Sequence, residues 1–141
     1  METMHFKRFE GGKIVDYSAK EGHDTFAKIV ETDEGSHRLG EVALGMNPGL
    51  DRVLKHPLFV EKVGGTLHIA IGSSYPECFV EDPVSAEGRR KTDELAEQGI
   101  LNRSAQHVDI VTDFRPGGCG RSVHIDGTEL APKNGGWEVM R

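Results

Sequence analysis

The residues that could carry chemistry in this chain lie in three short segments, each with a carboxylate or an imidazole among apolar residues or glycines. Glu41 is the first, because it follows Leu39 and Gly40 and is followed by the apolar residues 42–44. An unpaired carboxylate is very costly to bury in such surroundings. The sequence therefore predicts a positively charged partner for Glu41, and a divalent metal ion would supply that charge.

The second segment, residues 67–71, alternates around His68 and predicts a β-strand. Successive side chains of a strand point to opposite faces. The leucine and the two isoleucines of this segment therefore share one face, while His68 shares the other with Ala70 and Gly72. From this pattern we expect the imidazole to face an open surface made of small residues.

The third segment predicts a strand that begins with His107, where Asp109 stands two positions later and so on the same face. A mixture of Glu, Asp and His suits Zn, Co or Mn better than a thiolate site would. Neither cysteine is needed for such a site. Taken alone, Glu41 is explained equally well as an exposed glutamate or one at a helix N-terminus, so residue types and spacing do not by themselves decide for a metal centre.

Two further polar residues flank the His68 segment, and each has a simpler interpretation when taken alone. Glu61 ends a short apolar run beside Lys62, so a surface ion pair between these neighbours would explain it. Tyr75 follows the segment beside a turn, where a half-buried structural tyrosine is as good an interpretation as a functional one.

Three motifs carry a resemblance to a known family, and they occur in the order LGEVALG at 39–45, VEKVGGTLHIAIGSSY at 60–75 and NRSAQHVD at 102–109. They resemble the C-terminal half of metallo-aminopeptidases of the thermophilic aminopeptidase T type, and the match extends from about Phe6 to Trp137. The metal ligands or their close neighbours that the resemblance implies are Glu41, Glu61, His68, His107 and Asp109. It also implies catalytic roles for Tyr75 and Glu61, and a further metal-binding glutamate upstream of the first residue of this chain.

The chemistry implied by the resemblance is metal-dependent removal of the N-terminal residue from a peptide with a free N-terminus. Two divalent ions would lower the pKa of a bound water and polarise the scissile carbonyl, and one could hold the α-amino group. Tyr75 would donate a hydrogen bond to the oxyanion, a contribution of roughly 3 to 4 kcal/mol where a single donor has been removed.

Three functions remain open at the level of the sequence. The chain is a metal-dependent aminopeptidase or the catalytic half of one, or else a non-catalytic metal-binding or oligomerisation module derived from that family. A zinc-dependent amidase of another kind is the third. Because five ligand candidates suffice for one ion, we expect the chain to bind about one equivalent of Zn or Co and to turn over slowly without the upstream glutamate.

The fold predicted from the sequence is α+β, with a mixed, mainly antiparallel sheet of hairpins and two or three surface helices. Residues 1–141 are expected to form a single domain that resembles the metal-binding half of the aminopeptidases. Hairpins are predicted at Gly11–Gly12 and at Asp126–Gly127, and Trp137 is expected to cover the core. The predicted helices start at Asp24 or Thr25 and stop at Gly35, span Leu50 to Leu54, and run from a Ser85 cap to Gly99.

Composition restricts the partners. The formal net charge of −6 argues against nucleic acid as a partner, because binding its phosphates requires a basic face.

Cys78 and Cys119 have no CxxC spacing and are expected to be reduced, incidental thiols. No signal peptide and no apolar run long enough to cross a bilayer is visible, so we expect a cytoplasmic protein with no membrane partner. The resemblance and the exposed edge of the first hairpin imply a homodimer or a missing N-terminal half.

Overall fold

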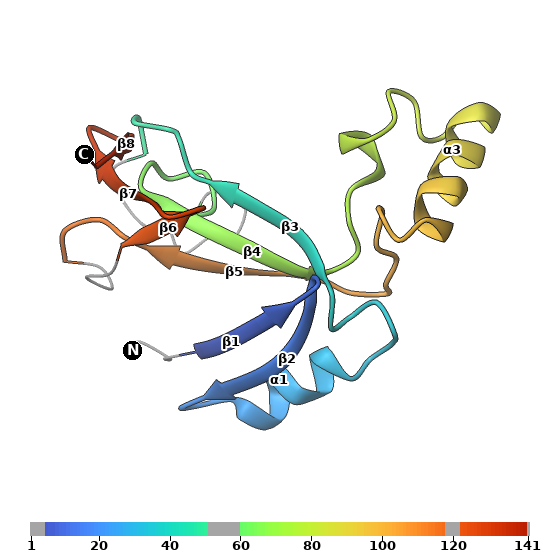
Figure 1. The fold of residues 1–141 in the computed structure, drawn as a ribbon, viewed down its shortest axis with the longest axis horizontal. Coiled ribbons are helices and arrows are strands. Elements are labelled where there is room, and N and C mark those ends of the chain that lie inside the picture. The colour runs from blue at the N-terminus through green and yellow to red at the C-terminus, as the bar shows by residue number, and fades with distance from the viewer. Residues whose placement is uncertain (1–4, 51–59, 118–121, 141) are drawn as a thin grey trace. The chain divides into compact units, whose positions relative to one another are not determined.

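The computed structural model describes residues 5–50, 60–117 and 122–140, and β-strands dominate these ranges (Figure 1). In chain order the elements are β1 (His5–Glu10), β2 (Lys13–Ala19), α1 (His23–Val30), β3 (Leu39–Leu44), β4 (Thr66–Gly72), the 3-10 turn η1 (Pro76–Cys78), α3 (Ala86–Glu97), β5 (His107–Asp113), β6 (Val123–Ile125), β7 (Thr128–Lys133) and β8 (Gly136–Val139). The strands form three sheets, in the orders β1-β2, β3-β4-β5 and β6-β7-β8. This arrangement confirms the predicted α+β class.

Two compact units are formed by residues Met1–Glu41 with Ala70–Val108 and by residues Val42–Ile69 with Asp109–Arg141. The first unit contains the β1-β2 hairpin, both α-helices of the described residues and the start of β5. The second contains the β6-β7-β8 sheet.

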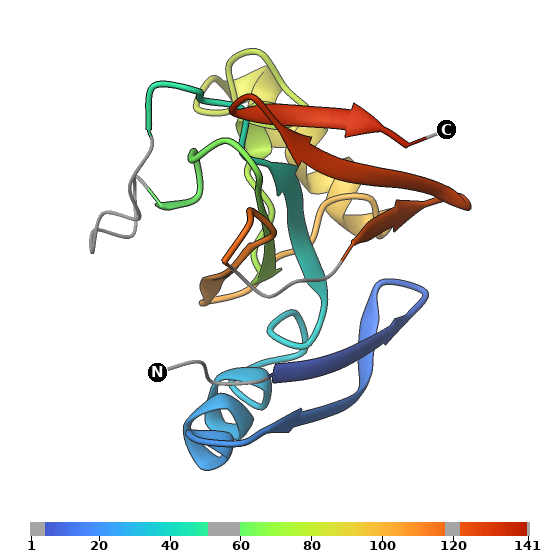
Figure 2. The same cartoon turned by 90° about the vertical axis from the view of Figure 1, so that its left-hand side faces the viewer.

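The β1-β2 hairpin of the first unit confirms the prediction of an antiparallel pair around Gly11 and Gly12. Helix α1 lies beside this hairpin (Figure 2) and contacts β2. The contact is aromatic, because the ring of Tyr17 meets the buried ring of Phe26 edge-on at 5.3 Å between centroids. Lys7 places its Nζ 5.1 Å from the centroid of the same ring, within the range of a cation–π interaction.

The predicted ends of α1 are wrong. Its N-cap is Gly22 in the left-handed conformation, so Asp24 lies inside the first turn, where a carboxylate favours the helix dipole. The helix ends at Val30 and not at Gly35. Beyond it the Asp33 carboxylate accepts hydrogen bonds from the N–H groups of Gly35 and Ser36, and such local bonds compete with a continuing helix.

The β3-β4-β5 sheet is antiparallel, as its backbone hydrogen bonds show. The N–H of Gly72 donates to the carbonyl of Arg38, whereas the N–H of Gly45 donates to the carbonyl of Thr66. On the other side of β4, the N–H of Ser73 donates to Gln106 and the carbonyl of Gly65 accepts from Phe114. β4 is therefore the central strand of this sheet.

The expectation that His68 faces an open surface is wrong, because its side chain is only 6% exposed. Thr66 and Ala70, on the same face of β4, are fully buried. Where a central strand carries small residues, neighbouring segments of the same chain can approach closely and fill the space above them. The small-residue face of β4 is thus covered, and the imidazole of His68 is held inside it.

Helix α3 confirms the prediction of a charged surface helix that begins after Ser85. The Ser85 Oγ accepts a hydrogen bond from the N–H of Gly88 at 3.0 Å, and Gly99 follows the C-cap residue Gln98. Exposed ion pairs at i, i+4 spacing link Glu87 to Lys91 and Arg90 to Glu94. This face is solvated, as the alternation of charges predicts.

We expect the replacement Ser85→Ala to lower the free energy of unfolding by about 1 kcal/mol, because the first turn of α3 loses the side chain that caps it. Urea unfolding followed by circular dichroism measures this effect. Ser85→Asp is the control, since aspartate also caps helices and should restore most of the loss. Equal stability of the alanine variant and the wild type would contradict the prediction.

The second unit confirms the predicted closing hairpin, in which β6 and β7 pair antiparallel across Asp126–Gly127. β8 was not predicted and pairs antiparallel with β7 after the turn at Asn134–Gly135. Trp137 on β8 is partly buried, donates its Nε1–H to the carbonyl of Gly45 at 3.1 Å and packs against Phe114.

The helix predicted at Leu50–Leu54 falls almost entirely on residues 51–59, outside the described residues, as does Cys119. Cys78 is an exposed free thiol. Within the described ranges, no helix has the length and apolar character required to cross a bilayer.

Candidate metal centre

Glu41 and His107 face each other in the first unit, on β3 and at the start of β5. Glu41 Oε2 lies 3.6 Å from His107 Nε2, and the two side chains are 30% and 19% exposed. Glu41 lies within β3, and His107 is the first residue of β5.

The orientation of His107 is set by its other ring nitrogen. Nδ1 lies 2.7 Å from the backbone carbonyl oxygen of Ser73. A carbonyl can only accept a hydrogen bond, so Nδ1 carries the proton, and in the neutral ring Nε2 carries the lone pair. The Nε2 atom and the Glu41 carboxylate are then both electron-pair donors, which is the arrangement that a cation stabilises.

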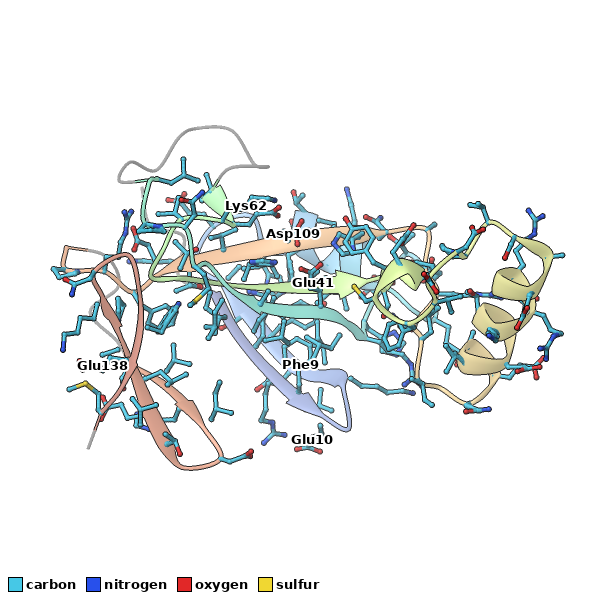
Figure 3. All side chains as sticks on the ribbon, turned by 90° about the horizontal axis from the view of Figure 1, so that it is seen from above. Phe9, Glu10, Glu41, Lys62, Asp109 and Glu138 are labelled. Carbon is cyan, nitrogen blue, oxygen red and sulfur yellow. The ribbon has the colours of Figure 1, made fainter. Side chains whose placement is uncertain are left out.

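His68 and Asp109 extend the set of metal-ligand atoms along the same sheet. Glu41 on β3, buried His68 on β4 and exposed Asp109 on β5 form a group whose residue types could hold a metal ion, and Glu41 belongs to the first unit while the other two belong to the second. Figure 3 labels Glu41 and Asp109 on their strands. That Glu41, His68, His107 and Asp109 converge on one metal site stays a prediction from the sequence.

Glu61 is placed differently from the other predicted ligands. Its carboxylate is 2.5 Å from the Nζ of the adjacent Lys62, the ion pair that the sequence suggested as the simpler interpretation. Among the described residues, Glu61 is not part of the cluster of Glu41, His68 and Asp109.

Tyr75 is the N-cap residue of η1, three residues beyond the end of β4, and is 50% exposed. Its ring contacts the imidazole of His107, with 4.5 Å between the centroids and a tilt of 52°. The Ser73 carbonyl and the Tyr75 ring thus both contact His107 within the first unit.

A hydrogen-bonded network that the sequence did not reveal fixes the entry into β5. The Asp33 carboxylate accepts from the N–H of Ala105 at 2.7 Å and from the Oγ of Ser104 at 3.1 Å. The side-chain amide of Asn102 donates to the carbonyls of Gly35 and Gly72. Asn and Asp near turns are signals of side-chain to backbone bonding, but the sequence does not say which backbone groups they reach.

The hydrogen bond from Ala105, with those from Ser104, Ser36 and Gly35, holds the pKa of Asp33 below its ordinary value of 3.8 against the opposing effect of desolvation. A carboxyl group whose pKa is depressed on folding stabilises the fold above its unfolded pKa, and this contribution disappears as the pH falls through the folded pKa. Asp33 should therefore contribute fully above about pH 4 and progressively less in stronger acid.

This predicts a pH-dependent difference between the wild type and Asp33→Asn. The variant should be less stable near neutral pH, and the difference in unfolding free energy should shrink as the pH falls below 4. Urea unfolding at a series of pH values from 3 to 7 measures it. A difference independent of pH would show that the charge of Asp33 does not stabilise this network.

The donor set is consistent with a divalent cation on chemical grounds. Two carboxylates and imidazole nitrogens are typical ligands of Zn and of neighbouring divalent transition metals. The buried position of His68 and the fixed ring of His107 limit the freedom of the ligands before a metal binds. This makes a metal centre the best description of the cluster.

Comparison with known proteins identifies the family. The model of the thermophilic metalloprotease (M29) family matches residues 2–127. Aminopeptidase AmpS of Bacillus subtilis (strain 168) is 36% identical to this chain over 141 residues, 92% of the chain and 30% of AmpS, and aminopeptidase T of Thermus aquaticus is 41% identical over 108 residues, 72% of the chain and 24% of that protein.

The solved structure of wild-type AmpT from Thermus thermophilus superposes with a TM-score of 0.55 and 30% sequence identity, covering 94% of this chain and 31% of AmpT. The chain thus spans less than a third of the length of these relatives. Because the family model covers most of the sequence, this chain belongs to the thermophilic metalloprotease (M29) family.

Proposed function

We propose that this chain forms the metal-binding part of a metal-dependent aminopeptidase, with Glu41, Glu61, His68, His107 and Asp109 as ligands. The observation that carries the proposal is the pairing of His107 Nε2 with the Glu41 carboxylate while Nδ1 is held by the Ser73 carbonyl. The family match and the aminopeptidase names of the relatives support it.

The distance between Glu41 and His107 is suited to a shared cation. Two atoms bonded to one ion at about 2.1 Å each can be at most about 4.2 Å apart. The 3.6 Å between Glu41 and His107 satisfies this limit.

A bound divalent ion would polarise the scissile carbonyl and lower the pKa of the attacking water. The residues of the chain would do the remaining work. Tyr75, half exposed beside His107, would donate a hydrogen bond from its hydroxyl group to the oxyanion. Glu61 is proposed to accept a proton from the attacking water, with its carboxylate oriented by Lys62.

Several finer features belong to the same proposal. The metal would be Zn, Co or Mn, the substrate a peptide with a free N-terminus, and the location the cytoplasm. Residues 1–141 would act as one domain, and the assembly would be a homodimer or a pairing with an N-terminal half. Light scattering tests the assembly directly, because a monomer at micromolar concentration and above would argue against a homodimer.

The test of the function is metal content together with hydrolysis of an aminoacyl reporter. We expect the purified chain to bind about one equivalent of Zn or Co and to hydrolyse the reporter slowly. Glu41→Gln should lose both properties, because the amide removes the negative charge while keeping the shape. Glu94→Gln, a change of the same kind on the solvated face of α3, should keep both.

The outcomes separate the candidate functions. Absence of specific metal binding by the wild type would contradict the proposal. Metal binding without any hydrolysis would favour the non-catalytic metal-binding module derived from the family, which the short span relative to the aminopeptidases also permits. Fast turnover by the chain alone would contradict the expectation that one ion is held by the five predicted ligands.

A further inference from the structure

We propose that Gly40 and Gly72 are positioning residues that hold the Ser73 carbonyl against His107 Nδ1, so that the lone pair of Nε2 is kept on the side of Glu41. The proposal rests on the metal site of the proposed function, but it concerns the protein before any metal binds. All of the groups involved lie in the first unit.

Gly40 allows the chain before Glu41 to pass very close to the end of β4. A Cβ atom at position 40 would lie 2.5 Å from the carbonyl oxygen of Gly72 and 2.7 Å from that of Ser73. Real Cβ atoms essentially never approach a carbonyl oxygen this closely, so any other residue at position 40 would displace one of the two chains. The carbonyl that Gly40 accommodates is the one that accepts from His107.

Gly72 meets the chain before His107 in the same way. Its φ is +100°, a conformation that residues with a side chain rarely adopt, and a Cβ there would lie 2.1 Å from the carbonyl oxygen of Gln106. The N–H of Ser73 donates to that carbonyl at 2.6 Å. This close approach fixes the distance between the Ser73 peptide and the backbone of His107.

Asn102 holds the carbonyl side of the peptide between Gly72 and Ser73. Its Nδ2 donates to the carbonyl of Gly72 at 2.7 Å and to that of Gly35 at 2.8 Å. The peptide between Gly72 and Ser73 is thus held from both sides, and the Ser73 carbonyl that follows it is directed at the imidazole.

The chemical consequence is control of the tautomer. The hydrogen bond at one ring nitrogen decides which nitrogen of a neutral histidine carries the proton, and it therefore decides which nitrogen is available as a ligand. Without the bond to Ser73, the proton can move to Nε2 and block the atom that lies 3.6 Å from Glu41. The two glycines would then act on metal affinity without contacting the metal.

The test uses nitrogen-15 NMR of the imidazole of His107 in the metal-free chain, at a pH at which the ring is neutral. We expect the wild type to show the tautomer protonated at Nδ1. In Gly40→Ala, the tautomer protonated at Nε2 should become populated, and titration with Zn should show an affinity about 10- to 100-fold lower.

Gly88→Ala is the matched control. Its Cβ would lie 1.8 Å from the carbonyl oxygen of Asp82, a clash at least as severe, but in α3 and away from β3 and β4. It should lower stability while leaving the tautomer and the Zn affinity unchanged. If Gly40→Ala does not fold, Asn102→Asp replaces it, because this change removes the donor to the Gly72 carbonyl at nearly constant size.

Two results would overturn the inference. One is a His107 ring that is protonated at Nε2 in the wild type, a result that NMR of the wild type alone would show. The other is a folded Gly40→Ala or Asn102→Asp chain with an unchanged tautomer and unchanged Zn affinity. Failure of the wild type to bind Zn would instead contradict the proposed metal site, and the tautomer measured in the metal-free chain would still decide the positioning role.

Discussion

Replacing His107 with alanine should abolish the binding of Zn or Co to this chain, with an affinity at least about 100-fold lower than that of the wild type. Changes in residues that only orient a ligand typically cost 10- to 100-fold in metal affinity, and the loss of a ligand itself should cost more. The imidazole is also the group whose geometry is best fixed, by the Ser73 carbonyl on one side and the Tyr75 ring on the other.

Isothermal titration of the metal-free protein measures this loss. His124→Ala is the matched control, because His124 is an exposed histidine on β6 that contacts Ser122 and has no predicted metal role. The control should bind metal as the wild type does. Equal affinities for His107→Ala and His124→Ala would exclude His107 as a ligand.

The largest expected loss of stability follows from Ile71→Ala. Ile71 is fully buried on β4, the central strand of its sheet, and is among the largest side chains of the described residues with no exposed surface. Removing its outer carbons gives up their burial and leaves a cavity, which typically costs about 2 to 5 kcal/mol. Unfolding by urea at pH 7 measures the difference.

Ile125→Ala makes the same chemical change on an isoleucine that is 49% exposed on β6. It should alter stability by no more than about 0.5 kcal/mol. A loss below about 1 kcal/mol for Ile71→Ala would mean that the space around Ile71 collapses on truncation, and that β4 is less rigidly packed than its burial indicates.

Local signals explain which elements could be predicted. The glycine pair after β1, the Asp126–Gly127 turn and the Ser85 cap are each decided by a few neighbouring residues, and all three were confirmed. The end of α1 was missed because Asp33 takes up backbone N–H groups through its side chain. β8 was missed although Asn134–Gly135 is a strong hairpin signal, because its strand is short and carries few apolar residues.

The candidate site also has features that the sequence could predict and features that it could not. Its side chains were predicted from three motifs that resemble a metallo-aminopeptidase family, because Glu61 and Tyr75 each have a simpler interpretation when taken alone. The covered position of His68 could not be read from residue types, because an alternating strand looks alike whether its small-residue face is open or packed. The roles of the Ser73 carbonyl and Asn102 were equally hidden, since every residue has a carbonyl and only the folded chain shows which one meets His107.

The segment that carries η1 and α3 leaves the sheet and returns to it at nearly the same point. The N–H of Ser74 donates to the carbonyl of Asn102 at 2.9 Å, and the N–H of Asn102 donates to the Oγ of Ser74 at 3.2 Å, so residues 75–101 form a loop closed at its base. Doubling the length of a closed flexible loop adds only about 0.6 kcal/mol of closure entropy. Beyond Tyr75, the length of this loop is thus decoupled from the register of β4 and β5. Insertions and deletions in α3 are the changes that evolution, or a protein engineer attaching a tag or a second domain, can make here while keeping the distance between Ser73 and His107.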